Sequence, residues 1–518
     1  MTIRTYPSRA ALPSRGPVPG RWLALAVLCL SLLMVSLDNL VLNVALPTLV
    51  RDLHATTTEL QWIVDAYVIV FAGLLLVAGS VADRIGRKRV FVAGLAAFAA
   101  GSTWAAFSQS VGLLIAARAS MGIGGAMMMP STLAIITSLF TDGAERQRAI
   151  GLWSATTGVG IALGPIVGGL LLARFWWGSV FLINVPVAVI AAALALRLVP
   201  ESKNPAALAP DLTGAVMSIA GLGLLLWSLI EAPVRGWSSP LVIAVGAAAL
   251  VVLALFAVWE RASTHPMLDM RFFRQRRFSA AVSSVGLATF GLFGTLFVLT
   301  QYLQFGLGYS ALQSGLRVLP AAGAIAVVAP LSTSLVRLVG TKVTAAAGLA
   351  VIAAGLWQIS TASATTTFAG ILAGVILLGV GAGLVIPPAT ESVVGSLPSD
   401  HVGVGSAANG AFLQVGGALG VAIIGSLLNT RYQDLMTSGL APYHVPLTVM
   451  TTVRGSIGGA LGVAGQVGGT LGAELARLAT TAFVSGMDLG LATGAAVGAV
   501  GVIIALLALP SRGPSVRP

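Results

Sequence analysis

The chain has 518 residues, of which 57% are hydrophobic and only 9% are charged, and its formal net charge is +12. This is more apolar surface than one soluble core buries, so the composition excludes a soluble globular protein and indicates one that uses lipid as its solvent. The positive charge does not predict nucleic-acid binding, because the cations are spread over short segments between apolar runs and do not gather on one face.

Apolar runs long enough to cross a bilayer recur along the chain. A spanning helix needs about 20 mostly apolar residues, and backbone inside hydrocarbon must satisfy its own hydrogen bonds, so each run predicts a helix. We expect fourteen spans near 22–46, 61–81, 88–107, 111–137, 148–172, 178–197, 212–231, 240–259, 279–302, 313–336, 343–361, 367–389, 404–428 and 484–508. Residues 1–21 are expected to form a disordered tail, and 511–518 a second tail.

The Lys and Arg residues orient these spans. Most of them fall in the loops on one side, and short loops rich in Lys and Arg stay in the cytoplasm. An even number of spans then places both termini in the cytoplasm.

Three charged residues fall inside the first four spans. These are Asp38, Asp65 and Arg118, at similar predicted depth, and a charge within the bilayer is costly enough to require a reason. Trp62 and Gln61 precede Asp65 by three and four residues, so an aromatic ring and an amide share its helix face, which suits an organic cation. The alternatives are a water-facing helix end for Asp65, a structural role for Asp38 with Arg118, Asn39 or Asn43, and snorkelling to the interface for Arg118.

The short loop after the second span carries a dense set of charges. Residues Gly79–Val90 read GSVADRIGRKRV and include one acid, four cations and a turn glycine. A degenerate copy, LVRLVGTK, occurs at Leu335–Lys342, with Gly340 in the place of Gly86. This repetition predicts two related six-helix bundles, at 22–200 and 263–510, separated by an inserted helix pair at 201–262.

The fifth span carries a stripe of glycines. Gly160, Gly164 and Gly168 recur every four residues and share one face, where another backbone can approach closely. Pro165, directly after Gly164, kinks the helix, and Gly169 ends the same stretch. The stripe predicts either a hinge between the two halves or simple close packing.

Residues 429–483 are expected to form a long outer loop. The stretch Val453–Leu471 is apolar enough to suggest a fifteenth span, but seven of its 19 residues are glycine, which weakens both helix formation and insertion.

The 79–90 loop resembles the signature G-x-x-x-D-R-x-G-R-[KR] between helices 2 and 3 of the major facilitator superfamily. Stretches 37–47 (LDNLVLNVALP), 118–126 (RASMGIGGA) and 158–169 (GVGIALGPIVGG) resemble its fourteen-helix drug:proton antiporter branch. The matching loop positions are Gly79, Asp83, Arg84, Gly86, Arg87 and Lys88.

The resemblance implies an all-α major facilitator fold and roles for these residues. Asp38, Asp65 and Arg118 would serve substrate-charge recognition and proton coupling, and the 158–169 stretch would be the antiporter helix. The 79–90 loop would latch the outward-facing state, with Asp83 accepting hydrogen bonds from a neighbouring helix N-terminus. The alternative is that the Lys and Arg residues of this loop only keep it on the cytoplasmic side and have no latching role.

The implied function is proton-driven export of amphipathic drugs across a bacterial plasma membrane, by a monomer that is not an enzyme and uses no cofactor or metal. Relatives that export dications carry further acids where this chain has Ile325, Asn409 and Gln414, so neutral or monocationic substrates are expected. Other functions left open are export of one endogenous metabolite or antibiotic, lipid transport and non-transporting sensing. The expected cavity residues are Asn39, Asn43, Trp62, Phe293, Phe297, Gln301, Asn409 and Gln414.

Overall fold

Helices form almost the whole described chain. The computed structural model describes residues 20–203, 210–264, 266–397, 402–443 and 445–509, and these contain no strand. The helices are α1 (Arg21–Leu53), α2 (Thr57–Ile85), α3 (Arg87–Ala106), α4 (Val111–Leu139), α5 (Gly143–Arg174), α6 (Ser179–Leu182), α7 (Asn184–Leu198), α8 (Leu212–Arg235), α9 (Pro240–Ala262), η1 (Phe272–Arg274), α10 (Arg276–Gln301), η2 (Tyr302–Gly306), α11 (Ala311–Ser360), α12 (Phe368–Val394), α13 (Val402–Leu440), α14 (Leu447–Gly455), α15 (Ile457–Val467) and α16 (Gly469–Ala508).

The number of membrane crossings agrees with the sequence prediction. Within the described ranges, 13 helical segments are long and apolar enough to span a membrane, including α11 as one 50-residue segment. Gly340 interrupts α11 with φ 84° and ψ 161°, which is not helical, so α11 contains two crossings and the total is fourteen.

Two glycines break the helices at corresponding places. Gly86 separates α2 from α3 with φ 134°, and Gly340 divides α11 with φ 84°. Both conformations are disfavoured for a residue with a Cβ atom. The degenerate repeat found in the sequence therefore marks the same backbone break in both halves of the chain.

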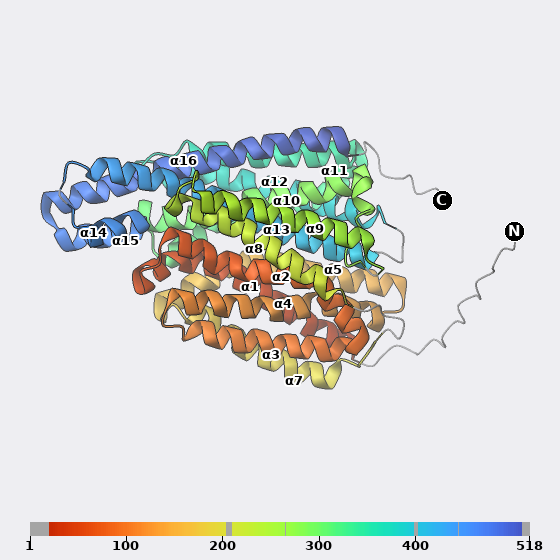
Figure 1. Ribbon diagram of the computed structural model, residues 1–518. Coiled ribbons are helices and arrows are strands. Elements are labelled where there is room, and N and C mark those ends of the chain that lie inside the picture. The colour runs from red at the N-terminus through yellow and green to blue at the C-terminus, as the bar shows by residue number, and fades with distance from the viewer. Residues whose placement is uncertain (1–19, 204–209, 265, 398–401, 444, 510–518) are drawn as a thin grey trace, which may run out of the picture.

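The helices form two groups. In Figure 1, α1 to α4 and α7 lie on one side, α10 to α13 and α16 lie on the other, and α8 and α9 cross the front. Within the groups, α1 packs on α5 and α2 on α4, while α10 packs on α13 and α11 on α12. The inserted α8 contacts both α2 and α13, so it bridges the two groups.

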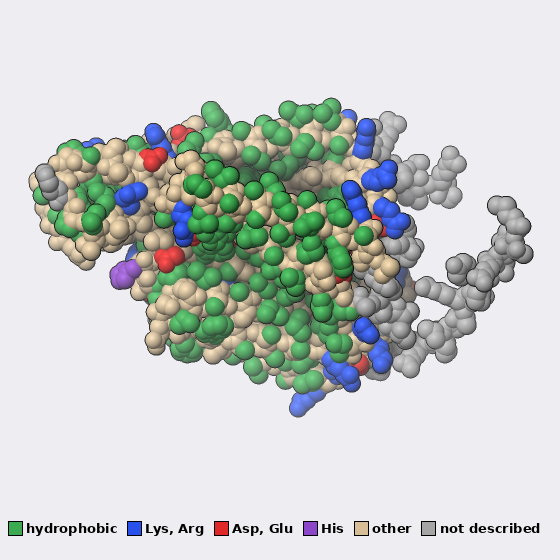
Figure 2. All heavy atoms as spheres, in the orientation of Figure 1, with side chains coloured by type: hydrophobic (Ala, Val, Ile, Leu, Met, Phe, Trp, Pro, Cys, Tyr) green, Lys and Arg blue, Asp and Glu red, His purple; other side chains and the backbone are tan. Residues whose placement is uncertain are grey.

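A broad apolar belt crosses the face of the bundle that Figure 2 shows. Figure 2 shows hydrophobic side chains over the middle of the molecule, with Lys and Arg side chains at both ends. The belt includes α9, of which only Val242, Ala249 and Glu260 are buried. A helix that exposes apolar side chains along nearly its whole length is stable against lipid and not against water.

Most of the described residues of 429–483 are helical, whereas a loop was expected. The segment contains the end of α13, α14, α15 and the start of α16, and α14 and α15 project from one end of the bundle in Figure 1. Ser456 caps α15 by accepting a hydrogen bond from the Gly459 amide at 3.1 Å, and α15 packs on α16. Tertiary packing therefore outweighs the low helix propensity of the glycines. At 11 residues, α15 is too short to span a membrane.

The expected tails lie mostly outside the described residues. Residues 1–19 and 511–518 are not described, but Gly20 and Arg21 are. Arg21 begins α1 and pairs with Glu145 of α5 at 2.7 Å, so the prediction of a disordered tail up to residue 21 was wrong at its last residue.

The two groups of helices touch at the end where α14 and α15 lie. Gly169 of α5 packs against Leu312 of α11, and a Cβ on this glycine would lie 2.5 Å from the Leu312 Cα. Gln304 donates to the Val44 carbonyl at 2.9 Å across the same boundary.

A further contact joins the groups at this end, because the Asn429 amide of α13 donates to the Thr58 hydroxyl of α2 at 3.1 Å. The structure is therefore closed at the α14–α15 end.

Candidate functional site

Asp38 and Arg118 form a buried ion pair. The Arg118 Nη1 lies 2.5 Å from Asp38 Oδ2, and the residues are 1% and 2% exposed. The pair joins α1 to α4 across 80 positions of sequence. Of the two kinds of partner proposed for Asp38, the structure selects Arg118, because the Asn39 and Asn43 amides donate to carbonyls of their own helix.

The Arg118 guanidinium is held on every side. Its Nε donates to the Ile63 carbonyl at 3.1 Å, and its Cζ lies 4.5 Å from the centre of the Tyr67 ring and 5.9 Å from that of Phe181. These contacts supply hydrogen bonding and cation–π stabilisation inside the bundle. Snorkelling to the interface is therefore not the role of this arginine in the structure.

Asn184 also belongs to this network, although the sequence reasoning did not select it. Its Nδ2 donates to Asp38 Oδ1 at 2.8 Å and lies 3.4 Å from the Ser102 hydroxyl. Asn184 is 2% exposed at the start of α7. The sequence does contain an indication of this role, because an amide side chain within an apolar membrane-spanning run needs a hydrogen-bond partner.

Asp65 differs sharply from Asp38. It is 0% exposed, and neither of its carboxylate oxygens has a hydrogen-bond partner. An ionised carboxylate buried in this way costs several kcal/mol unless a cation or a proton joins it. Asp65 is therefore a buried carboxyl group without a hydrogen-bond or ion-pair partner, and not a water-facing helix end.

The neighbours of Asp65 on α2 reach the other parts of the bundle. One turn earlier, the Gln61 amide donates to the carbonyls of Val421 and Ala422 on α13, each at 3.0 Å. Trp62 donates to Glu231 of α8 at 3.4 Å. Because residues three and four apart share a helix face, Asp65 lies on the face of α2 that meets α8 and α13.

A small central cavity lies between α1, α2, α4, α10 and α13. Of the expected cavity residues, Asn39, Asn43, Phe293 and Gln414 line it, and Arg118 forms part of its wall. A second, apolar cavity on the other side of Phe293 is lined by residues of α1, α10 and α11, including Ile325. Amides, one arginine and apolar side chains together suit an amphipathic ligand.

The other expected cavity residues do not line either cavity. Phe297 is fully buried, and Gln301 donates to the Phe297 carbonyl at 3.0 Å. The Asn409 side chain lies 3.3 Å from Thr390, and Trp62 contacts Glu231. Trp62, Gln301 and Asn409 thus make hydrogen bonds between or along helices in this conformation.

The glycine stripe of α5 has two packing partners. Gly160, Gly164 and Gly168 face Ser36, Leu40 and Val41 of α1, where an added Cβ would lie 2.5 to 3.1 Å from the nearest atom. Pro165 and Gly169 face α11, because Gly315 packs on the Pro165 carbonyl and Gly169 on Leu312. The same helix therefore packs closely within one group and across the boundary to the other.

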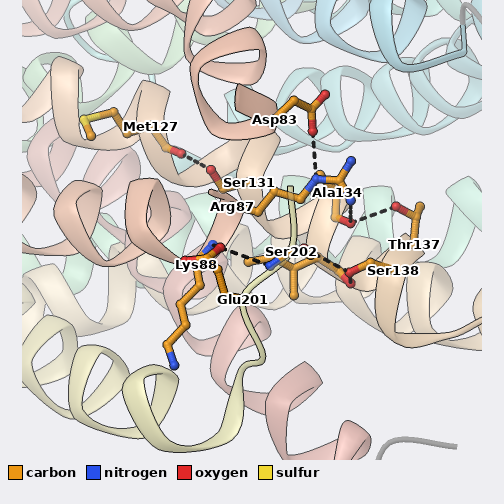
Figure 3. A network of polar contacts seen from close by, with 11 residues as sticks. Asp83, Arg87, Lys88, Met127, Ser131, Ala134, Thr137, Ser138, Glu201 and Ser202 are labelled. Carbon is orange, nitrogen blue, oxygen red and sulfur yellow. Dashed lines mark hydrogen bonds and ion pairs between the residues drawn. The ribbon is translucent and has the colours of Figure 1, made fainter. Parts of the chain in front are cut away.

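The 79–90 segment is a helix–glycine–helix junction with a short break at Gly86. Asp83 accepts from Arg87 Nε at 2.7 Å, and Arg87 also donates to the Ala134 carbonyl of α4 at 3.1 Å (Figure 3). Asp83 is thus paired with a side chain of its own loop in this structure, whereas the family resemblance predicted hydrogen bonds from a neighbouring helix N-terminus. Gly79 packs on Pro130, and Arg84 is exposed.

Glu201 completes this junction and was missed by the sequence reasoning. Its Oε1 accepts from the Lys88 amide at 3.1 Å, at the N-terminus of α3, and its Oε2 lies 3.7 Å from Arg89 (Figure 3 shows the Lys88 contact). The Arg87 amide donates to the Ser202 carbonyl at 2.9 Å. A carboxylate at a helix N-terminus is favoured by the helix dipole. Glu201 and Ser202, which follow α7, are thereby fixed to the 79–90 loop.

Gly86→Ala should destabilise the protein. The substitution forces a Cβ into φ 134° and places it 2.7 Å from Glu201 Oε1, and a strained backbone conformation costs about 1–3 kcal/mol. The measurement is thermal unfolding of the purified protein in detergent. Gly151→Ala in α5 is the matched control, because that position is helical and has open space, so it should be neutral or slightly stabilising. Equal melting temperatures for Gly86→Ala and wild type would contradict the strain argument.

Among the described residues, no three His, Cys, Asp or Glu side chains come together in a way that could hold a metal ion.

The chain resembles several known proteins. Residues 28–421 match the family model described as the Major Facilitator Superfamily. The multidrug efflux pump LfrA of Mycolicibacterium smegmatis is 36% identical over 85% of this chain and 86% of that protein. The tetracenomycin C resistance and export protein of Streptomyces glaucescens is 34% identical over 86% of this chain and 84% of that protein.

A solved structure has the same fold. It is a bacterial homologue of the human lysosomal transporter Spinster, with a TM-score of 0.67, 15% sequence identity, and coverage of 95% of this chain and 97% of that chain. At this identity the likeness concerns the fold alone.

Proposed function

The chain belongs to the major facilitator superfamily, and from this premise we propose that it exports amphipathic cationic or neutral drugs in exchange for protons. In this proposal it works as a monomer in a bacterial plasma membrane, with the proton gradient as its energy source and no cofactor. Its relatives include proteins named for multidrug efflux and for antibiotic export.

The observation that carries the proposal is the buried, unpartnered carboxylate of Asp65. Asp38 already has both oxygens engaged, by Arg118 and by Asn184, whereas Asp65 has neither engaged. We therefore assign proton coupling to Asp65 and a charge-balancing role to the Asp38–Arg118 pair. A proton or a substrate cation satisfies Asp65 equally, so the two ligands compete for it.

We propose that export proceeds by alternating access between the two groups of helices. We place the 79–90 loop and both termini in the cytoplasm, and we expect substrate to enter at this end from the cytoplasm or the inner leaflet. Export then requires the α14–α15 end to separate, at the α5–α11 and α2–α13 contacts. The stripe on α5 and the 79–90 junction are the elements that we expect to act as the hinge and the latch in this change.

The central test uses purified protein in proteoliposomes with an imposed pH gradient. Tetraphenylphosphonium, a monovalent lipophilic cation, should move against its gradient, and a protonophore should stop this movement. Substrate-dependent proton movement should be detected in the same vesicles. Failure of a broad panel of cationic and neutral drugs to move would overturn multidrug antiport.

A second candidate function is export of a single endogenous metabolite or antibiotic. The relative named for tetracenomycin C resistance and export supports this alternative. The breadth of the substrate profile separates the two functions, because a dedicated exporter moves one compound and its close analogues only. Transport of labelled lipid between leaflets, measured in the same vesicles, tests the remaining lipid-transport alternative.

A disulfide across the closed end should block transport. Thr58→Cys and Asn429→Cys, introduced into a Cys29→Ser background, place two thiols at the α2–α13 contact, where the Asn429 amide donates to the Thr58 hydroxyl at 3.1 Å, and their oxidation should stop transport until a reductant is added. The control pair is Val77→Cys with Ala215→Cys, which lies in the apolar cluster between α2 and α8 and should leave transport intact. Continued transport by the fully cross-linked first pair would show that this end need not open.

A further inference from the structure

The Asp38 carboxylate is held by two donors on opposite sides of the residue. Arg118 binds Oδ2 at 2.5 Å and Asn184 binds Oδ1 at 2.8 Å, and all three residues are at most 2% exposed. Arg118 also lines the central cavity, whereas Asp38 and Asn184 do not. The carboxylate therefore lies behind the arginine, as seen from the cavity.

We infer that Asn184 is a positioning residue that fixes Asp38 against Arg118, so that the cavity presents a neutralised arginine to a positively charged substrate. This inference rests on the proposed export function and adds to it a determinant of substrate charge. The amide is suited to this task because it donates a hydrogen bond without bringing a second charge to the pair.

The packing of α6 and α7 positions Asn184 beside the Asp38–Arg118 pair. Only Ile183 separates the short α6 from α7, and the two helices together bring the Phe181 ring and the Asn184 amide to the ion pair. Ser102 of α3 lies 3.4 Å from the same amide nitrogen and orients it. Three helices, α3, α6 and α7, thus support a pair whose charged members come from α1 and α4.

Loss of the amide would loosen the pair without removing either charge. With one oxygen free, the carboxylate is no longer fixed opposite the guanidinium, and Arg118 then contributes more of its positive charge to the cavity. A cationic substrate would be repelled, whereas a neutral substrate would be affected little. A purely structural role for Asn184 would affect both kinds of substrate alike.

The transport experiment compares the KM values of tetraphenylphosphonium and Nile red, a neutral amphipathic dye, in proteoliposomes. Asn184→Leu should raise the KM of the cation roughly tenfold, which corresponds to about 1.4 kcal/mol, and leave the KM of Nile red nearly unchanged. Asn184→Ser, which keeps a shorter donor, should fall between wild type and Asn184→Leu. Thr103→Ala, the control, removes an exposed hydroxyl of α3 that donates only to the Ala99 carbonyl of its own helix, and should behave like wild type. Equal changes for both substrates, or none, would overturn the inference.

Melting temperatures measured without substrate test the role of Asn184 separately from the proposed export function. Asn184→Leu should lower the melting temperature in the wild-type background but not in Asp38→Leu with Arg118→Met, which has no carboxylate for the amide to bind. An equal loss in both backgrounds would overturn the role of Asn184, whatever the protein transports. If wild type moves neither probe while this coupling is found, the proposed multidrug function fails and the Asn184–Asp38 interaction stands.

Discussion

Asp65→Asn should abolish proton-driven transport without destabilising the protein. Asp65 is fully buried, and both of its oxygens lack a partner, so no native interaction is lost when the carboxylate becomes an amide. The amide has almost the same shape and cannot ionise, which removes the cost of a buried charge together with the ability to take up and release a proton. Functional groups that are unfavourable for folding commonly show this combination of lost activity and retained stability.

Two measurements on the same preparation check this prediction. The melting temperature in detergent should equal or exceed that of wild type, and proton-driven efflux of tetraphenylphosphonium should fall to the level of empty liposomes. Asp434→Asn is the control, because this aspartate is exposed on α13 and its change should leave both quantities at the wild-type value. Wild-type transport by Asp65→Asn would remove Asp65 from the coupling mechanism. A large loss of stability would show that Asp65 has a structural partner.

Arg118→Met should have the opposite effect on stability. It leaves Asp38 as a buried carboxylate without its cation, and breaking a buried ion pair on one side costs about 3–5 kcal/mol. The Nε hydrogen bond to Ile63 and the contact with the Tyr67 ring are lost as well. We expect little folded protein from this variant at ordinary expression temperature.

The double substitution Asp38→Leu with Arg118→Met should recover much of this stability. Replacing both members of a buried pair by apolar residues of similar size is often neutral, because neither charge then needs to be desolvated. Folded yield and melting temperature in detergent measure the recovery. Transport should remain absent in the double variant, because the cavity wall has lost its charge pair. Equal destabilisation by the single and double substitutions would contradict the ion-pair interpretation.

Most of the fold was predictable from local sequence. The position of each span follows from the length of its apolar run, because lipid forces the backbone to satisfy its own hydrogen bonds and leaves the helix as the solution. The repeat at Leu335–Lys342 correctly indicated a break at Gly340 that corresponds to the one at Gly86. The same reasoning did not predict the helices within 429–483, where packing of α15 on α16 overcomes the low propensity of its glycines, although α15 is too short to be a fifteenth span.

For the candidate site, the sequence predicted which charged residues belong to it, but not how they interact. Asp38, Asp65 and Arg118 stand out because a charge in an apolar run is rare and costly. Their sequence positions do not reveal that Arg118 neutralises Asp38 and leaves Asp65 without a partner. Asn184 and Glu201 were missed for the same reason, because each acquires its role from a residue that lies more than 100 positions away.

Local sequence was thus enough to identify a membrane protein, to place its membrane-spanning helices, and to single out the few charged residues inside them. These are local properties, decided by the free energy of placing each short segment in lipid. The tertiary structure alone decided which charges are paired, which aspartate remains free, and which end of the bundle is closed. Those properties depend on distances between helices that are far apart in the chain, and no local pattern of apolar residues encodes such distances.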